Sequence, residues 1–386
     1  MNKKTILFVC DSLHTLVSGS TFSTLRFIDL LKNDYNIVCL ETKSNKIKKN
    51  FEKKDKVKIY YLNSILLPKT HKELYLGFPR KKTIKTIILK EKIDIVYTIL
   101  PTPLATKTLK VAKKLNLKTI SASHSQIENL LGDNKNDLIY KIIEKAYSKY
   151  LSYIYNNADK IVFPSEFAKQ CLNNLIQSSK KIEVISNGVD LNKFKLLKNI
   201  DKKKYNLNEN EIVLLFIGRI FPEKSIDTLI KAVSILKKHN NNFKVIIAGS
   251  GISEEHLKKL TTKLHLNNKI NFLGRVSDKD LIELYNIADI FVFPSIAELE
   301  GMVVLEAMAC KTAIITSDSK SNASKNFILD NGLIFKHKNH KDLAKKILIL
   351  LDNLGLLEKM KKNSYKMSKN YSIENSTKLL KTKVLE

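Results

Sequence analysis

Short apolar runs alternate with longer, helix-patterned stretches along the whole chain, and this alternation constrains the fold more than any other feature. A short apolar run between turn residues is typical of a strand buried on both faces, as in a parallel sheet. The alternation predicts an α/β fold with parallel sheets rather than separate all-α and all-β parts. The predicted strands are residues 5–9, 37–40, 57–61, 93–98, 118–121, 160–163, 182–185, 212–217, 243–248, 270–273, 290–293 and 313–315.

The chain is long enough for two domains, because 386 residues with 44% hydrophobic content can form two cores of ordinary size. Residues 186–194 are rich in turn residues, which indicates an interdomain linker. A fresh series of strands and helices then starts at residue 212. The helical pattern of residues 372–385 predicts a last helix at the C-terminus.

The sequence gives no sign of a membrane span, a secretory signal or a cysteine-based site. No apolar run approaches the roughly 18 residues of a spanning helix, and residues 5–9 are too few for the core of a signal peptide. We therefore expect a cytoplasmic protein. The cysteines lack CxxC spacing, so they predict neither a zinc site nor a disulfide framework and are interpreted as small buried residues: Cys10, Cys39, Cys171 and Cys310.

The net charge of +29 comes almost entirely from lysine, since the chain has only four arginines. So basic a surface attracts polyanions, whether nucleic acid or an anionic membrane. Compositional bias explains part of the excess. The bias also makes each arginine informative, because the guanidinium group suits bidentate contacts with phosphate.

The segment Phe291 to Cys310 carries the strongest functional signal. A buried strand runs into Pro294, and a helical pattern follows with Glu298 before the helix and Glu306 within it. The first turn presents free backbone N–H groups, which attract phosphate, while the two carboxylates suit sugar and ribose hydroxyls. The amides are those of Gly301, Met302 and Val303. The alternative is ordinary helix chemistry, with a capping acid at Glu298 or Glu300 and a surface acid at Glu306.

A second cluster follows the predicted strand 212–217. Gly218 allows a close approach of the backbone, and Arg219 and Lys224 lie five positions apart across a loop, where both can reach one diphosphate. The alternative is a pair of surface cations in a lysine-rich chain.

Glycines also end the next two strands, at Gly249 and Gly251 and then at Gly274, which is followed by Arg275 and Val276. The carboxyl ends of parallel strands line the crevice in which α/β proteins bind nucleotides. A single Gly-x-Gly is weak support, so the recurrence at successive strand ends carries the argument. Asp278-Lys279-Asp280 resembles a metal-binding Asp-x-Asp, but we interpret the two acids as first-turn residues of the helix 281–288.

In the first half of the chain, His124 follows the predicted strand 118–121. A histidine at the carboxyl edge of a strand can donate a hydrogen bond to a sugar hydroxyl and remain neutral near pH 7. A lone histidine is more often structural. Gln126 and Glu128 are weaker candidates on the acceptor side, and Gly19 lies in the first loop between strand and helix.

The segment around Glu298 and Glu306 resembles the Glu-x7-Glu signature of retaining glycosyltransferases of family 4, which have the GT-B architecture. In that family the first Glu contacts the donor sugar, the amides that follow hold the diphosphate, and the second Glu binds the ribose. The chain departs from the usual Glu-Gly-Phe-Gly, since it has Glu298-Leu299-Glu300-Gly301, and from the usual Gly-x-Pro, since it has Lys311-Thr312-Ala313.

The resemblance extends to other motifs. The family's Gly-Arg-x4-Lys-Gly uses both cations on the donor phosphates, and Ser225 replaces its last glycine here. By resemblance, the segment 274–276 flanks the base, His124 contacts the donor sugar, and the loop of Gly19 approaches the transferred sugar and phosphate. GT-B enzymes generally need no bound metal, so we expect no metal and no cofactor.

The resemblance also implies a domain layout of two Rossmann-like doubly wound domains that face each other across a cleft. Residues 1–185 would form the acceptor-side domain, 186–194 the linker and 195–370 the nucleotide-sugar-binding domain. Residues 371–386 would form a helix that crosses back to the first domain.

A lysine-rich stretch in the first half points to a membrane surface. Lysines at eight positions between 43 and 58 precede the apolar residues 62–68, and residues 75–79 run into Arg80, Lys81, Lys82 and Lys85. Cations beside exposed Leu, Tyr and Phe side chains suit an anionic leaflet, at about 1 kcal/mol per cation. The alternative is a solvated lysine face over an ordinary core. Family 4 members that glycosylate lipids dock on membranes through this region.

The sequence thus predicts a retaining glycosyltransferase that moves a hexose from a nucleoside diphosphate sugar, such as UDP-glucose, to a membrane lipid or glycan precursor. The expected location is the inner face of the cell membrane, as a peripheral protein. One alternative is a sugar-nucleotide epimerase of the same fold. Another is a nucleic-acid-binding protein, although the chain lacks recognition motifs, so no specific nucleic acid partner is expected.

Overall fold

The computed structural model describes residues 3–11, 13, 19–44, 47–66, 75–124, 138–177, 181–239 and 242–386. These residues form two compact units. The N-terminal unit contains the described residues up to Asn187 together with Ile373–Glu386, and the C-terminal unit contains Gly188–Ser372. Among the described residues, the chain passes between the units after Asn187 and after Ser372.

The N-terminal unit is built on an eight-stranded sheet in the order β10-β9-β8-β7-β1-β2-β4-β3. All neighbouring strands are parallel except β3 and β4. The strands are β1 (Thr5–Val9), β2 (Asn36–Thr42), β3 (Phe51–Lys54), β4 (Val57–Leu62), β7 (Ile95–Thr98), β8 (Lys118–Ala122), β9 (Lys160–Phe163) and β10 (Lys181–Val184).

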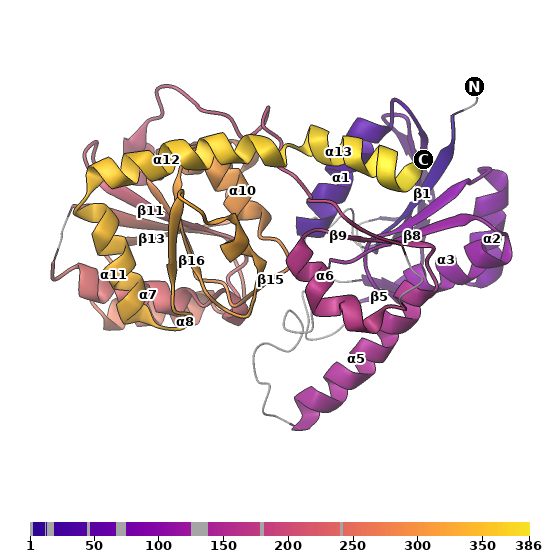
Figure 1. The fold of residues 1–386 in the computed structure, drawn as a ribbon, viewed down its shortest axis with the longest axis horizontal. Helices are drawn as coiled ribbons and strands as arrows, with labels where there is room; N and C mark the ends of the chain where they lie inside the picture. The colour runs from indigo at the N-terminus through magenta and orange to yellow at the C-terminus, as the bar shows by residue number, and fades with distance from the viewer. Residues whose placement is uncertain are drawn as a thin grey trace. The chain divides into compact units, whose positions relative to one another are not determined.

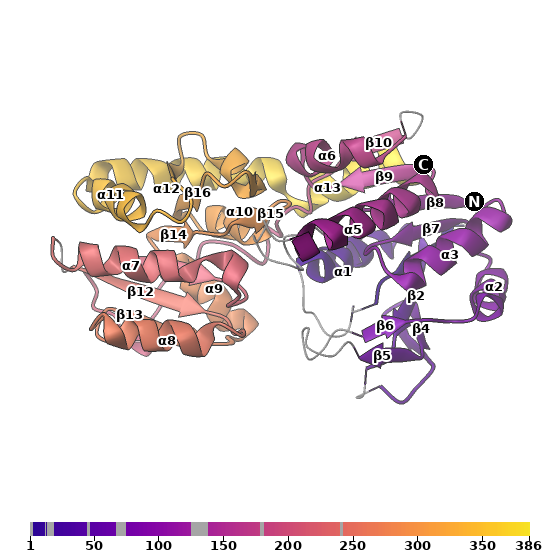
Figure 2. The ribbon, with the colours of Figure 1, turned by 90° about the horizontal axis from the view of Figure 1, so that it is seen from below.

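The helices of this unit cover both faces of its sheet, because successive side chains of a strand point to opposite faces. Ile6 and Phe8 of β1 pack in a cluster with α1, whereas Leu7 and Val9 pack in a cluster with α2 and α3. The helices are α1 (Gly19–Leu31), α2 (Lys81–Lys90), α3 (Pro103–Lys114), α5 (Leu138–Asn156) and α6 (Glu166–Leu172). A hairpin of β5 (Ser64–Leu66) and β6 (Tyr75–Gly77) lies beside β2 (Figure 2).

The last helix of the chain, α13 (Ile373–Leu380), packs against α1 in the N-terminal unit (Figure 1). It continues as a π-helical turn over Lys381–Leu385. Ile373, Leu380 and Leu385 are buried in the same cluster as Phe8. Burial of this apolar stripe explains why the helix forms, and the predicted helix 372–385 is confirmed.

The C-terminal unit contains a six-stranded parallel sheet in the order β13-β12-β11-β14-β16-β18. In Figure 1, α10 and α12 lie on one side of this sheet and α7, α8 and α11 on the other. The strands are β11 (Ile212–Ile217), β12 (Phe243–Ala248), β13 (Ile270–Gly274), β14 (Ile290–Phe293), β16 (Ala313–Ser317) and β18 (Gly332–Phe335). The helices are α7 (Ile226–Leu236), α8 (Glu254–Lys263), α9 (Asp278–Ile287), α10 (Met302–Ala309), α11 (His340–Leu351) and α12 (Leu354–Ser368).

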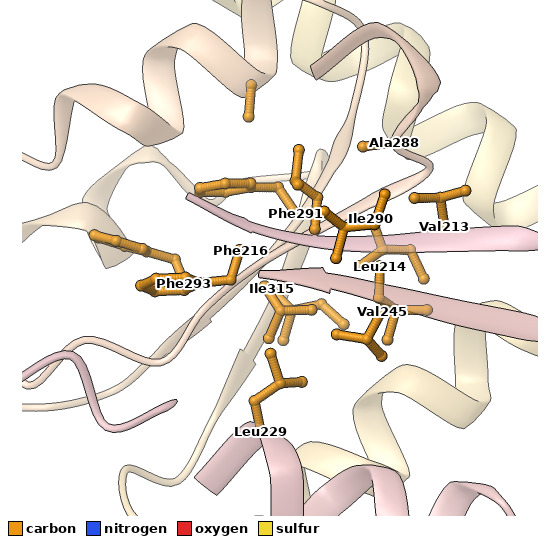
Figure 3. Packing of buried hydrophobic residues seen from close by; sticks show 14 of the residues in the cluster. Val213, Leu214, Phe216, Leu229, Val245, Ala288, Ile290, Phe291, Phe293 and Ile315 are labelled. Atoms are coloured by element: carbon orange, nitrogen blue, oxygen red, sulfur yellow. The ribbon is translucent and has the colours of Figure 1, made fainter. Parts of the chain in front are cut away.

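Three phenylalanine rings pack among the aliphatic side chains in the core of the C-terminal unit (Figure 3). The rings of Phe216 and Phe293 are stacked with centroids 6.3 Å apart, and those of Phe291 and Phe293 are 5.8 Å apart. All three side chains are buried. This packing fixes strands β11 and β14, the pair between which the strand order reverses.

Both sheets have the doubly wound order, so the predicted α/β architecture is confirmed. The order reverses between β11 and β14 in one unit and between β1 and β7 in the other. Ligands of open α/β sheets bind at such switch points, outside the carboxyl ends of the strands. Strand 93–98 begins two residues later than predicted, at Ile95, because Lys92 has a left-handed backbone and the chain reaches the sheet only after it.

Candidate functional site

The carboxyl ends of β11, β12 and β13 meet through glycines. Gly218, Gly249 and Gly274 all have positive φ, and the Gly249 N–H donates to the carbonyl of Gly274 at 2.7 Å. A Cβ on Gly249 would lie 1.8 Å from the carbonyl oxygen of Gly218. A Cβ on Gly251 would lie 2.2 Å from that of Ile220. These glycines are therefore required by the packing of backbone on backbone at this edge.

Arg219 and Lys224 follow this edge and differ in their surroundings. The Arg219 guanidinium lies 5.2 Å from the centre of the Phe221 ring and donates to the Glu223 carboxylate at 3.2 Å, with about a third of its side chain exposed. Lys224 is buried in the short 3₁₀ helix η3 (Pro222–Lys224), beside the Phe293 ring. Both cations lie near the end of β11, as the sequence predicted. Because Lys224 is buried, its ammonium group needs a specific partner.

That partner is Glu298, which forms an ion pair with Lys224. The Ser295 hydroxyl donates a second hydrogen bond to the same carboxylate oxygen, at 2.8 Å. Glu298 lies in a two-residue strand, β15 (Ala297–Glu298), which pairs with β17 (Ser321–Asn322). The loop is also tied to η3, because the Ile296 N–H donates to the Glu223 carbonyl at 2.8 Å. Glu298 is thus held in place and charge-paired.

Helix α10 begins directly after this loop, with Gly301 as its N-cap at φ 91°. A Cβ at Gly301 would lie 2.8 Å from that of Ser324, so no larger residue fits. Gly301 itself has no side chain that could cap this helix. Glu298 is bonded to Lys224 and Ser295, so the interpretation of Glu298 as a capping acid is wrong, whereas that of Glu300 stays a prediction. The first amides of α10, at Met302 and Val303, lie at the helix start, where backbone N–H groups attract anions.

Glu306 is buried one turn further along α10 and accepts a hydrogen bond from the Tyr285 hydroxyl at 3.1 Å. The alternative interpretation of Glu306 as a surface acid is wrong. The burial of the site and the charge of Glu306 both change the pKa of the neighbouring Cys310 thiol. Burial, together with the nearby carboxylate, raises the pKa of Cys310 to about 12.

The end of β13 is the most open part of this edge. A Cβ on Gly274 would meet no atom within 4 Å, and Arg275 donates to the Ser250 hydroxyl at 3.0 Å. Val276 packs partly buried against the core. Asp278 and Asp280 lie in the first turn of α9, as predicted, and Ser277 caps that helix. Across the described residues, no group of three or more His, Cys, Asp or Glu side chains is placed to hold a metal ion.

His124 lies in the N-terminal unit, just past the end of β8. Its imidazole lines a small cavity together with Phe8, Tyr97 and Val162. Burial lowers the pKa of His124 to about 4, so the ring is neutral at pH 7. Gly19 is the first residue of α1. Gln126 and Glu128 lie outside the described residues, so their acceptor-side role stays a prediction.

The sequence predicted the charged members of the site but missed the polar residues behind them. Ser295, Tyr285 and Asn322 are buried and bonded to the site or its loop, yet none carries a charge or a motif. Ser295 follows a predicted strand and lies three residues before Glu298, which is the one signal that could have identified it.

Comparison with known families matches both halves of the chain. Residues 30–193 match the family described as glycosyltransferase family 4, and residues 198–367 match glycosyl transferases group 1. An uncharacterized glycosyltransferase of Methanocaldococcus jannaschii, MJ1178, is 30% identical over 75% of this chain and 74% of its own length. The chain therefore belongs to glycosyltransferase family 4, and the predicted enzyme class is confirmed.

Two further similarities are more distant. The α-monoglucosyldiacylglycerol synthase of Acholeplasma laidlawii is 26% identical over 77% of this chain and 76% of its own length. The solved structure of Anabaena HepE in complex with UDP is 15% identical, covers 99% of both chains and has a TM-score of 0.79, which confirms the GT-B fold. Some alignments are shorter, since this chain covers 60% of M. jannaschii MJ1607 and 52% of the Streptococcus pneumoniae α-monoglucosyldiacylglycerol synthase.

Proposed function

We propose that this protein transfers a hexose from a nucleoside diphosphate sugar, UDP-glucose or a similar donor, to a membrane lipid or glycan precursor with retention at the anomeric carbon. The contact between Lys224 and Glu298 carries the proposal. A cation suited to phosphate meets a carboxylate suited to sugar hydroxyls, beside the start of α10, whose N-cap is Gly301. A nucleoside diphosphate sugar offers both groups at adjoining positions.

The diphosphate would be held by Arg219, Lys224 and the amides of Met302 and Val303. Transfer of the hexose breaks the bond between its anomeric carbon and the diphosphate, and negative charge grows on the leaving oxygen. Fixed cations and amides stabilise that charge without reorganising, which is the main catalytic contribution available here. We infer a front-face reaction, in which the acceptor enters on the side from which the diphosphate leaves.

Because Lys224 and Glu298 are paired, the donor would bind these two residues one after the other, first Lys224 through its phosphate and then Glu298 through its sugar. A diphosphate arriving at Lys224 competes with the Glu298 carboxylate for the same ammonium group. Once the ammonium binds phosphate, the carboxylate is able to accept from a sugar hydroxyl while Ser295 keeps it in place. Glu306, oriented by Tyr285, would bind the ribose. That HepE was solved with UDP and with UDP-glucose supports this type of donor.

The donor is tested by thermal shift with UDP-glucose, GDP-mannose and related donors. We expect one donor to stabilise the wild type, and the Glu298→Ala and Arg219→Ala variants to lose that stabilisation. Equal stabilisation of all three proteins would contradict the site. Incubating the donor with membrane lipid extract then separates the reactions, because a new glycolipid supports transfer whereas an altered free sugar nucleotide supports epimerisation.

The lipid acceptor is favoured by two apolar patches of the N-terminal unit. Leu138 and Ile142, one turn apart at the start of α5, are 71% and 60% exposed, beside the exposed Lys141 and Lys145. The first turns of α5 extend beyond the neighbouring helices in Figure 1. Within the described chain, no helix combines the length and apolarity needed to cross a bilayer.

The second patch lies in the predicted membrane segment and corrects it in part. Ile65 is 64% exposed and Phe78 is 50% exposed, as the prediction requires, but Leu62 and Tyr75 are buried in the unit. Leu62 ends the buried strand β4 of the eight-stranded sheet, whereas Ile65 lies in the separate two-stranded sheet of β5 and β6.

Sedimentation with vesicles tests the membrane partner. We expect binding to vesicles that contain anionic lipid, and a loss of at least about 100-fold in the variant Leu138→Ser/Ile142→Ser, because each exposed apolar side chain stabilises insertion by about 1.5–3 kcal/mol when buried. Leu329→Ser, an exposed leucine of the C-terminal unit, is the matched control. Equal binding to neutral vesicles, or an equal loss in the control, would contradict the proposal.

A further inference from the structure

A cluster of fully buried polar side chains lies behind the Glu298 loop. Ser295, Thr316, Ser317, Asn322 and Ser324 each have 0% of their surface exposed. They come from the end of β14, from β16, from β17 and from the turn after β17. Buried polar groups are costly unless their hydrogen bonds are made, so such a cluster persists only where its bonds fix something.

Asn322 is the centre of this cluster, since both ends of its amide are bonded. Its Nδ2 lies 3.2 Å from the Ser295 carbonyl oxygen and 3.1 Å from the Ser317 hydroxyl. Its Oδ1 accepts from the N–H and the hydroxyl of Ser324, at 3.0 and 2.7 Å. The Ser317 hydroxyl also donates to the Ser295 carbonyl, at 2.5 Å. One side chain therefore joins the strand end that precedes Glu298 to the turn after β17.

The same hydrogen bonds connect Asn322 to both Glu298 and the start of α10. Asn322 pairs with Glu298 in the β15–β17 ladder, and Ser295, held by Asn322, donates to the Glu298 carboxylate at 2.8 Å. Ser324, held by the other end of the amide, is the residue against which Gly301 packs. The position of the carboxylate and the start of α10 thus depend on one buried amide.

We infer that Asn322 is a positioning residue that sets the geometry with which Glu298 holds the donor sugar. Asn322 is fully buried and acts through Ser295 and the β15–β17 pair, so it does not touch the donor. The inference rests on the proposed function, in which Glu298 contacts the sugar. It assigns the Nδ2 end of Asn322 to recognition of the sugar and not of the nucleotide, because the contacts of Arg219 and Glu306 do not pass through it and the start of α10 is held through the Oδ1 end.

The variant Asn322→Asp changes one end of the amide and preserves the other. An aspartate has the same shape and can still accept from Ser324, but its second oxygen cannot donate to Ser295 or Ser317. Two oxygens would then face each other across a buried contact, and the Ser295 segment would shift. Ser295→Ala is the second variant, since it removes only the hydroxyl that donates to Glu298.

The test measures the dissociation constants of UDP and UDP-glucose by calorimetry, and kcat and KM for the donor. We expect Asn322→Asp to bind UDP within about twofold of the wild type and to lose about tenfold of the donor kcat/KM, the size of one lost hydrogen bond to a charged group. Ser295→Ala should show the same selective loss. The double variant should lose little more, because both changes act on one contact.

Asn331→Ala is the matched control, because Asn331 is an equally buried amide of the same unit, bonded to the N–H of Leu329 and outside the cluster. We expect it to lower the melting temperature without changing the ratio of UDP-glucose to UDP affinity. Equal weakening of both ligands by Asn322→Asp, or no weakening of either, overturns the inference. If Asn322→Asp does not fold, Ser295→Ala alone decides in the same way. A wild type that binds neither ligand overturns the proposed function itself, and with it this inference.

Discussion

The two sheets share one topology but end their strands in different ways. In the C-terminal unit, β11, β12 and β13 run into Gly218, Gly249 and Gly274, and the backbone itself forms the edge. In the N-terminal unit, β1 runs into the buried Asp11, whose carboxylate accepts from the Thr102 hydroxyl and from the Gly77 N–H.

The difference between the strand ends indicates which of the two switch points suits an anion. Glycine-ended strands keep this edge free of side chains beside the cations Arg219 and Lys224, which suit a diphosphate. A buried carboxylate at the corresponding edge repels an anion and uses its hydrogen bonds to hold the hairpin of β6 and the start of α3. Topology therefore supplied two possible nucleotide sites, and the residues at the strand ends support one.

The largest effect is expected at the tightest glycine. Gly249→Ala places a methyl group 1.8 Å from the Gly218 carbonyl oxygen at a φ of 137°, so the edge of β11 and β12 cannot close. We expect a loss of more than about 4 kcal/mol in the free energy of unfolding, measured by urea denaturation. A variant of near wild-type stability would show that backbone packing does not define this edge.

The next largest effect is expected in catalysis. Lys224→Met removes the buried cation, and we expect the rate of sugar transfer to fall by about 100- to 1000-fold, as for the loss of one group that stabilises a leaving anion. Lys231→Met is the matched control. Its ammonium is more exposed and pairs with Asp227 within α7, so its loss should leave the rate unchanged. A similar rate for both variants would refute the role of Lys224.

Two titratable groups of the N-terminal unit, Asp11 and His124, give opposite pH dependences. Burial raises the pKa of Asp11 from 3.8 to about 6, so its stabilising contribution is present below pH 4 and is lost as the pH rises through 6. Burial lowers the pKa of His124 from 6.5 to about 4, so its contribution is present above pH 6.5 and is lost as the pH falls through 4. Each amounts to about 3 kcal/mol, so their sum is nearly flat between pH 4 and 6.

Variants that remove one group at a time separate the contributions of Asp11 and His124. The measurement is the melting temperature as a function of pH. Asp11→Asn leaves His124 alone, so stability should rise with pH across this range. His124→Asn leaves Asp11, so stability should fall. The same slope in both variants would mean that the two groups do not titrate as their burial requires.

The smallest effect is expected at the open end of the glycine edge. Gly274→Ala meets no atom within 4 Å, so only the positive φ of 66° opposes it, at a cost of about 1 kcal/mol. Urea denaturation beside Gly249→Ala measures the difference. If Gly249→Ala and Gly274→Ala lower the free energy of unfolding equally, backbone conformation and not atomic contact determines the stability of this edge.

Most strands and the charged site residues could be predicted because both depend on local sequence. Strands buried on two faces read as continuous apolar runs, which is why residues 212–217 and 290–293 were predicted with their observed bounds. The spacing of Glu298 and Glu306 around a glycine and an apolar helix likewise fixed their register. Strands β3, β5, β6, β15, β17 and β18 were missed, because each is at most four residues long and too short for a clear pattern.

The sequence by itself predicted the α/β class with parallel sheets and the acids and cations of the candidate site, because apolar periodicity and charge are local properties of the chain. The doubly wound order followed from the resemblance. Only the tertiary structure decided that Lys224 is buried against Glu298, that Glu306 is held by Tyr285, and that Gly301 is the N-cap of α10. It also decided that Asn322, 24 positions after Glu298, pairs beside it. Such contacts join residues far apart in the chain, and the burial that makes them strong arises only when the sheets and helices pack.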